Sequence, residues 1–285
     1  MAFSKRRLTF IVGFAVVAFI AFASAATYVS VSTSTPSSLG FTGPRIPIRG
    51  ASGQSLNWAG YAVTSSAGSV TSVSGSWKVP TVSCAKKSSY AAFWVGIDGF
   101  NDNTVEQTGV LAQCSSGSAT YSAWYEFYPA SPVYASSSDA VKPGDIMSAS
   151  VTYSSSGNCF TTTLTDVTEG WTYTSPCTAV TGAQRSSAEW ITERPAIGNS
   201  LTTLADFGTA YYGYDYTSVS STNYVTINGV TTPMGSSTGT LNSITMVSSG
   251  PGSKTLASPS PVSSDYTSFS VTYASSSGGT SHGPH

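Results

Sequence analysis

Short apolar runs rich in valine, threonine and aromatic residues alternate with glycine, serine, asparagine and proline from Asn57 onward. Runs of roughly 4–8 such residues with period-two alternation are typical of β-strands, and the small and polar residues between them are typical of turns. The pattern predicts strands over residues 69–79, 91–97, 118–128, 146–153, 159–166, 187–192, 223–227, 242–247 and 267–273. Asn228-Gly229 predicts a type I′ hairpin turn, and residues 200–208 are a weak helical candidate. Strands of this spacing predict an all-β protein, an antiparallel two-sheet β-sandwich.

The N-terminus follows a different pattern, with a basic start, an apolar run and a small-residue end at Lys5-Arg6-Arg7, Leu8 to Phe22 and Ala23-Ser24-Ala25. This order predicts a signal peptide over residues 1–25 and a secreted protein. An uncleaved membrane anchor is the alternative, although the apolar run is short for a bilayer span of about 20 residues. Residues 26–51 are predicted to be a linker or short propeptide, residues 52–275 a single catalytic β-sandwich domain, and residues 276–285 a disordered tail.

Charge is scarce in this chain, at 9% of residues against a usual value of about 25%. Without residues 1–25 the chain has 9 basic and 13 acidic residues, since 3 of its 12 basic residues lie in that segment. The resulting formal charge of −4 is too weak to indicate nucleic acid or anionic lipid as a partner. Membrane contact is expected only during export or through an uncleaved N-terminus. Few titratable groups also predict a stability that depends weakly on pH.

Four cysteines follow the predicted export signal, so disulfides are expected. Three pairings are possible, and the sequential one, Cys84–Cys114 with Cys159–Cys177, closes the shortest loops and joins segments that read as neighbouring strands. A metal site is the competing interpretation. It is disfavoured because there is no Cys-x-x-Cys pair, and because His282 and His285, in the Ser/Gly-rich tail, are the chain's two histidines. We expect no metal and no cofactor. A Ser-His-Asp or Cys-His catalytic centre is excluded on the same ground.

Two polar residues interrupt aromatic-rich strands, where a buried carboxylate or amide destabilises the fold unless it is hydrogen-bonded. Glu126 lies between Trp124 and Tyr128 on one face of its strand, because side chains alternate between faces. Gln107 shares a face with Val105 and Gly109. If both strands belong to one sheet, Glu126 and Gln107 can face the same groove.

Together these two groups suit acyl hydrolysis by activated water in acid. A glutamate can accept a proton from water and return it to a leaving amine, and its ordinary pKa of about 4.3 suits roughly pH 3–4. A glutamine amide can hold a developing oxyanion without titrating, and such donors contribute about 2.7–4 kcal/mol in the transition state.

Five motifs, in this order, resemble those of the glutamic peptidases (eqolisins, family G1): Asn57-Trp58-Ala59-Gly60-Tyr61, Trp94-Val95-Gly96-Ile97-Asp98-Gly99, Glu106-Gln107-Thr108-Gly109, Trp124-Tyr125-Glu126-Phe127-Tyr128-Pro129 and Ala188-Glu189-Trp190-Ile191. The resemblance runs from about Asn57 to Gly208. Phe127 departs from it, since a tryptophan is common there, and the stretch before the domain is short for a propeptide.

The resemblance implies a secreted, acid-acting, pepstatin-insensitive endopeptidase with a concanavalin A-like jelly-roll sandwich. It maps a catalytic glutamine and glutamate onto Gln107 and Glu126, and implies that the cleft is lined or supported by Trp58, Trp94, Asp98 and Glu189. Trp124 and Tyr128, which flank Glu126, complete the predicted substrate-binding set. The expected partners are protein or peptide substrates, and nothing in the sequence suggests more than a monomer.

Several of these residues also have a structural interpretation. Glu126 can be a buried acid bonded to tyrosine or tryptophan, Gln107 a polar residue at a turn, and the tryptophans core residues. Asp98 can cap a turn. The Asp98, Asp102 and Asn103 cluster hints at calcium, but its spacing does not match an EF-hand loop. Glu189 shares a face with Ile191, which favours a buried position over a surface pair with Glu193.

Two other functions compete with the peptidase. A retaining or inverting glycosidase would need a second acid opposite Glu126, either Glu106 or Glu189, with Gln107 incidental. A non-catalytic sugar-binding module would use the tryptophans as stacking platforms. An aspartic peptidase is disfavoured, because the chain contains neither Asp-Thr-Gly nor Asp-Ser-Gly.

Overall fold

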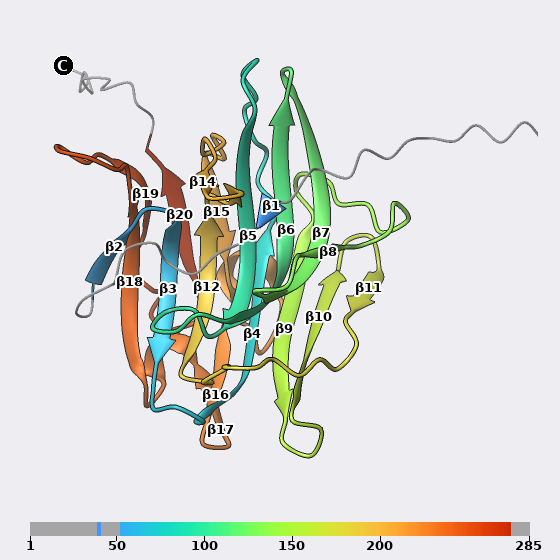
Figure 1. The fold of residues 1–285 in the computed structure, drawn as a ribbon, viewed down its shortest axis with the longest axis vertical. Helices are drawn as coiled ribbons and strands as arrows, with labels where there is room; N and C mark the ends of the chain where they lie inside the picture. Colours follow the sequence, from blue (N-terminus) through green and yellow to red (C-terminus); the bar gives the residue numbers. More distant parts are fainter. Residues whose placement is uncertain (1–38, 41–51, 275–285) are drawn as a thin grey trace, which may run out of the picture. The chain divides into compact units, whose positions relative to one another are not determined.

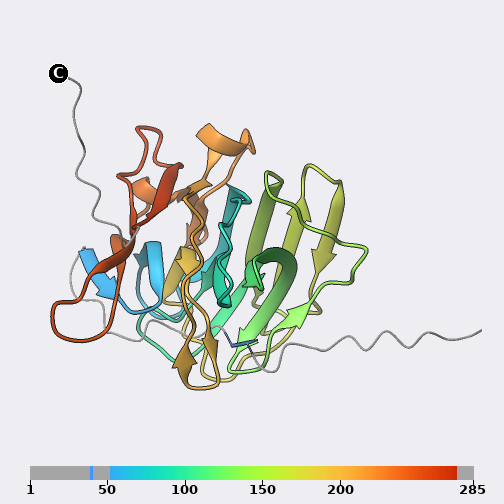
Figure 2. The ribbon, with the colours of Figure 1, turned by 90° about the horizontal axis from the view of Figure 1, so that it is seen from above.

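The structure is a computed structural model that describes residues 39–40 and 52–274. The chain divides into two compact units, Met1–Thr35 and Pro36–His285, and every described residue belongs to the second. One continuous ladder of paired strands builds the second unit and folds into two layers (Figures 1 and 2). The fold is therefore the predicted all-β sandwich, with its two layers joined through shared strands.

The first layer contains the strands that carry the candidate site. Its strands pair in the order β8 (Val133–Tyr134), β7 (Ser118–Tyr128), β6 (Val105–Ser115), β5 (Ser89–Ile97), β12 (Ser187–Glu193), β3 (Trp58–Thr64) and β18 (Thr240–Val247). All of these pairings are antiparallel. At the outer edge β2 (Ser52–Ser55) pairs with β18 in parallel, which is an exception to the predicted antiparallel pattern.

The second layer continues the ladder beyond β18. Its strands pair in the order β19 (Thr255–Pro259), β20 (Phe269–Tyr273), β15 (Thr209–Tyr212), β4 (Val70–Lys78), β9 (Ile146–Ser154), β10 (Cys159–Asp166) and β11 (Trp171–Thr174). A hairpin of β16 (Tyr224–Ile227) and β17 (Val230–Pro233) also pairs with β4.

Three short strands form a separate small sheet: β1 (Leu39–Gly40), β13 (Ala196–Ile197) and β14 (Ser200–Leu201). Helical structure among the described residues is limited to α1 (Tyr214–Thr217) and the 3₁₀ turn η1 (Met234–Ser236). No described helix is long and apolar enough to span a membrane.

Side chains from both layers fill a core between them, as strand alternation requires. Its largest members include Trp77, Trp190, Phe93, Tyr212 and Phe269, all almost fully buried. The rings of Tyr212 and Phe269 stack, with centroids 4.8 Å apart and planes 1° from parallel. A second apolar cluster lies on the opposite face of the first layer and is built around tryptophans and aliphatic residues: Trp58, Trp94, Trp124, Leu111, Ile191 and Ile244. We call this the site face.

The strand predictions agree with the structure to within one or two residues at most ends, and strands 118–128 and 159–166 match exactly as β7 and β10. The predicted hairpin turn is confirmed, because Asn228 and Gly229 both have positive φ, at 52° and 80°, and join β16 to β17.

The helical candidate at residues 200–208 is wrong. That segment contains β14 and then runs in extended form, with Leu204 and Asp206 in isolated bridges to Tyr90 and Ser83. Its backbone finds partners in distant strands, and those tertiary pairings override its weak local preference.

The disulfide prediction is confirmed, with bonds between Cys84 and Cys114 and between Cys159 and Cys177. The first ties the loop after β4 to the end of β6, and the second ties the start of β10 to the loop after β11. The predicted signal peptide and the predicted disordered tail lie outside the described residues, and so does the predicted linker except for Leu39–Gly40.

Candidate active site

The first polar pair of the site is formed across two neighbouring strands. Gln107 on β6 lies directly opposite Glu126 on β7, so their side chains project from the same face of the sheet. The Gln107 Nε2 donates a hydrogen bond of 2.7 Å to Glu126 Oε2. Both side chains are only 1% exposed. The structure thus brings together the two residues for which the sequence predicts catalytic roles.

A second glutamate occupies the same row of the sheet. Gln107 is opposite Gly96 on β5, and Gly96 is opposite Glu189 on β12. Opposed residues project from one face, so Glu189 lies on the site face with Gln107 and Glu126. Gly96 itself has no side chain, and the Trp94 ring of the same strand comes within 3.0 Å of the place where a Cβ of residue 96 would lie.

Glu189 is fully buried, and neither of its carboxyl oxygens has a hydrogen-bond partner within the described residues. Burial raises the pKa of Glu189 well above its ordinary value, and the charges of Asp98, Asp102 and Glu106 raise it further, while the Ser187 hydroxyl lowers it in part. An unpartnered buried carboxyl group is costly, which is typical of a functional residue.

Three tryptophans form the adjoining part of the site face. Two residues along these strands from the row of Gln107, Trp94 on β5 and Trp124 on β7 flank Gly109 on β6. Trp58 on β3 packs edge-on against Trp94, with ring centroids 5.0 Å apart. All three are fully buried, so they form the apolar surroundings of the glutamates and glutamine in this structure.

Glu193 is a site-face residue to which sequence analysis gave no role. It follows Glu189 by four residues on β12, and accepts hydrogen bonds from Trp94 Nε1 at 2.9 Å and from Asn57 Nδ2 at 3.2 Å. These contacts fix the Trp94 ring and join β12 to the chain just before β3. Its alternation with Glu189 was a usable signal, since residues four apart share a strand face.

Tyr134 is the second residue that sequence analysis missed. It lies on β8 opposite Trp124, and its hydroxyl is buried without a hydrogen-bond partner among the described residues. The pKa of Tyr134 is raised, mainly by burial and secondly by the charge of Glu126. Tyr134 and Tyr128 pack against the site-face cluster on the side of Glu126.

Asp98 has a structural role that accounts for its burial. It lies at the end of β5 with φ 69°, and its carboxylate accepts backbone N–H bonds of 2.6–2.8 Å from Gln184, Arg185 and Ser186. These bonds hold the segment that leads into β12, so Asp98 acts on the site through the position of Glu189. Its carboxylate is occupied by a distant segment and not by its own turn, where Asp102 accepts the Gly99 N–H at 2.7 Å instead.

Glu106 does not face the site. It is opposite Phe127 and Ile97, both members of the core between the layers, so it projects from the other face of β6. This position removes Glu106 as the partner acid of Glu126 in a glycosidase. Among the described residues, no group of three or more histidine, cysteine or acidic side chains is arranged to hold a metal ion.

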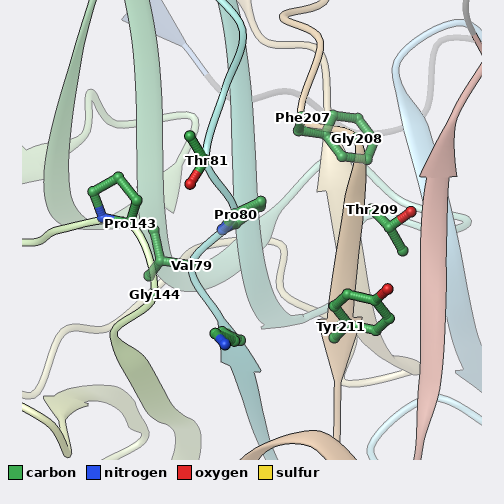
Figure 3. A pocket seen from close by; sticks show the side chains of 10 residues that line it. Val79, Pro80, Thr81, Pro143, Gly144, Phe207, Gly208, Thr209 and Tyr211 are labelled. Carbon is green, nitrogen blue, oxygen red and sulfur yellow. The ribbon is translucent and has the colours of Figure 1, made fainter.

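A pocket of about 460 Å³ lies elsewhere, at the end of β4 and along β15 (Figure 3). Its walls include Pro80, Pro143, Phe207 and Tyr211, and Lys78 is the charged residue that lines it. None of the site-face residues lines this pocket, and its walls offer no carboxylate that could activate water.

Comparison with known proteins identifies the family of the chain. The profile of the Peptidase A4 family matches residues 56–255. Aspergillopepsin-2 of Aspergillus niger is 33% identical over 180 residues, which make up 55% of this chain and 62% of that protein. The chain thus matches less than two thirds of the length of this relative.

Solved structures show the same fold. The crystal structure of aspergilloglutamic peptidase from Aspergillus niger aligns with 30% identity and a TM-score of 0.53, over 65% of this chain and 99% of that one. Scytalido-glutamic peptidase, solved with a transition state analog inhibitor, aligns with a TM-score of 0.62 over 77% of this chain and 98% of that one. At 24% identity, this second likeness supports the fold alone.

The fold and the site define a β-sandwich protein with a buried glutamine between two glutamates on one face of a sheet. The family match covers most of the chain and contains all of these residues. The chain belongs to the Peptidase A4 family, the eqolisins or glutamic peptidases, and the resemblance stated from the sequence is confirmed.

Proposed function

We propose that the chain is a secreted endopeptidase that hydrolyses peptide bonds in acid, with water activated by a glutamate and the oxyanion held by Gln107. The observation that carries this proposal is the 2.7 Å hydrogen bond between Gln107 and Glu126 within a buried row that also contains Glu189. The two disulfides support an exported protein, because such bonds persist in oxidising compartments. The expected partners are proteins or peptides, and the chain is expected to act as a monomer.

Gln107 suits the role of oxyanion donor because its amide does not titrate. One N–H of the Gln107 Nε2 donates to Glu126, which holds the amide in position and leaves its second N–H for a developing negative charge without the rearrangement that water would need. Glu126 lies opposite Gln107 on β7, and Gly96, which has no side chain, lies opposite Gln107 on β5.

The sequence identifies Glu126 as the base, and the structure offers Glu189 as a second candidate. A base needs an oxygen that can receive a proton from water. Oε2 of Glu126 already accepts the Gln107 amide, whereas neither oxygen of Glu189 has a partner among the described residues. Burial raises the pKa of Glu189 in the closed site, and water that enters with the substrate solvates the carboxyl group and lowers its pKa toward the ordinary value, so that it is ionised and can accept a proton in acid. We therefore assign proton transfer to Glu189 and the orientation of Gln107 to Glu126.

Acid action and indifference to pepstatin belong to the same proposal. Among the described residues there is no histidine, so no group that works best near neutral pH takes part. The near-complete burial of the row means that substrate must displace neighbouring side chains to reach it.

The test compares kcat/KM for a peptide substrate at pH 2–7, with pepstatin present, in the parent protein and four variants. We expect activity in acid for the parent. Glu189→Gln should reduce kcat/KM by about 10³-fold or more. Gln107→Ala should reduce it by roughly 10²–10³-fold. Glu126→Gln should lower it only about tenfold, because the new amide oxygen can still accept from Gln107.

Glu169→Gln is the matched control, because Glu169 makes an exposed ion pair with Lys142 and lies between β10 and β11, neither of which carries the site row, so it should leave kcat/KM unchanged. Loss of all activity in Glu126→Gln with activity retained in Glu189→Gln would return the role of base to Glu126. A folded parent protein that cleaves no peptide at any pH would overturn the peptidase and favour the sugar-binding alternatives.

A further inference from the structure

A second group of acidic residues lies behind the site row, at the turn between β5 and β6. We call Asp98, Asp102 and Glu106 the carboxyl cluster. Asp98 and Glu106 are fully buried, and Asp102 is partly buried. The proposed reaction uses none of the three, so their burial needs a separate physical reason.

The cluster holds the start of β12 to the end of β5. Asp98 accepts three backbone N–H groups from residues 184–186, and its own N–H donates to Ser187 O at 3.1 Å. The Ser186 hydroxyl lies 3.4 Å from Asp98 Oδ1 and 3.4 Å from Asp102 Oδ2, so it can donate to either carboxylate. Asp102 also accepts the Gly99 N–H at 2.7 Å. Glu189 follows Ser187 by two residues.

No basic group of the described residues is among the main causes that shift the pKa values of Asp102, Glu106 and Glu189. The groups that shift the pKa values of Asp102 and Glu106 are carboxylates, hydroxyls and backbone N–H groups from β5, the turn and β6. From β12, Ser187 and Glu189 add a hydroxyl and another carboxyl group. Arg185 belongs to the segment that Asp98 holds, but its guanidinium lies over the Tyr153 ring, 4.0 Å from the ring centroid.

The environment of Glu106 is independent evidence that the carboxyl cluster binds protons in the folded protein. Both of its oxygens are buried without a hydrogen-bond partner within the described residues. An ionised carboxylate in that position would be neither solvated nor paired, whereas the protonated group is much less costly to bury.

We propose that the carboxyl cluster is a proton-dependent attachment between the β5–β6 turn and the start of β12, which holds Glu189 in place in acid and releases it as the pH rises toward neutral. This proposal goes beyond the proposed catalysis, because it concerns the range of pH over which the folded protein persists. It assigns Asp98, Asp102 and Glu106 a role in positioning β12, without contact with substrate.

The pKa directions agree with this role. Burial first, and then the charge of Asp98, raise the pKa of Asp102 to about 7, and burial with the charges of Asp98 and Asp102 raises the pKa of Glu106 to about 9. Above their ordinary values near 4, the folded protein therefore binds more protons than the unfolded chain. Stability falls with rising pH under that condition, from about pH 4 through pH 7 for Asp102 and on toward pH 9 for Glu106.

The test measures the melting temperature from pH 3 to 8 in a Gln107→Ala background, which prevents self-digestion if the peptidase proposal holds. We expect a fall of about 10 °C or more between pH 4 and 8. Glu106→Gln, which resembles the protonated glutamate in shape, should remove a substantial part of that fall. Glu169→Gln is the control and should keep the full fall, because Glu169 is exposed.

Asp102→Asn and amide exchange supply a second, independent readout. Asp102→Asn should also reduce the fall of the melting temperature with pH. In the parent, hydrogen exchange at the backbone N–H groups of residues 184–186 should accelerate with pH by more than the intrinsic rate does. In Glu106→Gln this extra acceleration should be smaller. The proposal would be overturned if the melting temperature fell equally with pH in Glu106→Gln, in Asp102→Asn and in the parent. None of these measurements uses a substrate, so failure of the peptidase proposal leaves this test intact.

Discussion

At the scale of single residues, burial gives a few carboxyl groups a large influence on how the stability of the protein depends on pH. The chain has only 13 acidic residues, from which the sequence predicts a weak dependence of stability on pH. The structure changes that expectation, because Glu106 and Glu189 are fully buried and have raised pKa values. A count of charges cannot reveal this, since the free energy depends on the environment of each group.

Glu193→Ala tests whether Glu193 holds the tryptophans of the site face. The change removes the carboxylate that accepts from the buried Trp94 Nε1 and from Asn57 Nδ2. We expect the free energy of unfolding in urea to fall by about 2–4 kcal/mol, with a shift in tryptophan fluorescence. Glu169→Ala should change stability by less than about 0.5 kcal/mol. Equal stability of the two variants would contradict the role given to Glu193.

Sequence analysis recovered the central residues of the candidate site because they break a local rule. Gln107 and Glu126 are polar groups in aromatic strands, and strand alternation assigned both to the right faces. Glu193 and Tyr134 were missed for a different reason. Strand alternation places Glu193 on the face of Glu189, but its donors lie 99 and 136 residues away in the chain, so no local pattern predicts those contacts. The Glu126 environment of Tyr134 likewise depends on how β8 folds back on β7.

At the scale of elements, strand register decides which residues meet. The row Glu126, Gln107, Gly96 and Glu189 crosses four strands whose order in the sheet is not their order in the sequence. The sequence predicts each strand but not that β12 lies beside β5, because a pairing over about 90 residues is chosen by the whole core. The misread segment at residues 200–208 shows the same limit, since its partners are Tyr90 and Ser83.

Gly96→Ala tests the importance of the open position in this row. A Cβ at residue 96 would lie 3.0 Å from the Trp94 ring and 3.2 Å from Gln107 Cβ, which is tight but can be relieved by small shifts. We expect a folded protein with a loss of stability of about 1–3 kcal/mol and a disproportionate loss of kcat. Gly117→Asn, in the open β6–β7 turn, should preserve both stability and kcat, because asparagine tolerates the φ of 85° at residue 117. Full activity in a folded Gly96→Ala protein would show that the site row does not need a residue without a side chain at position 96.

At the scale of the whole molecule, two disulfides and one shared core stabilise the two layers. The bonds close loops of 30 and 18 residues and lie in different parts of the ladder. Replacing Cys84 and Cys114 by alanine, or Cys159 and Cys177, should each lower the free energy of unfolding by about 2–4 kcal/mol, because the unfolded chain gains freedom. Urea unfolding measures both effects, and they should add, because the two bonds share no partners. Unchanged urea midpoints in both double variants would refute this expectation.

The position of β3 in the ladder has a consequence for the order in which the molecule is assembled. β3 begins at Trp58, yet its two neighbours, β12 and β18, end at Glu193 and Val247. Contacts between residues so distant in the chain must wait for the closure of long loops, which slows folding. As the chain grows from its N-terminus, Gln107 and Glu126 are made well before β12, which carries Glu189. The row of the candidate site therefore forms only after β12 has been made and has paired with β5, and a shorter nascent chain cannot hold these three side chains together.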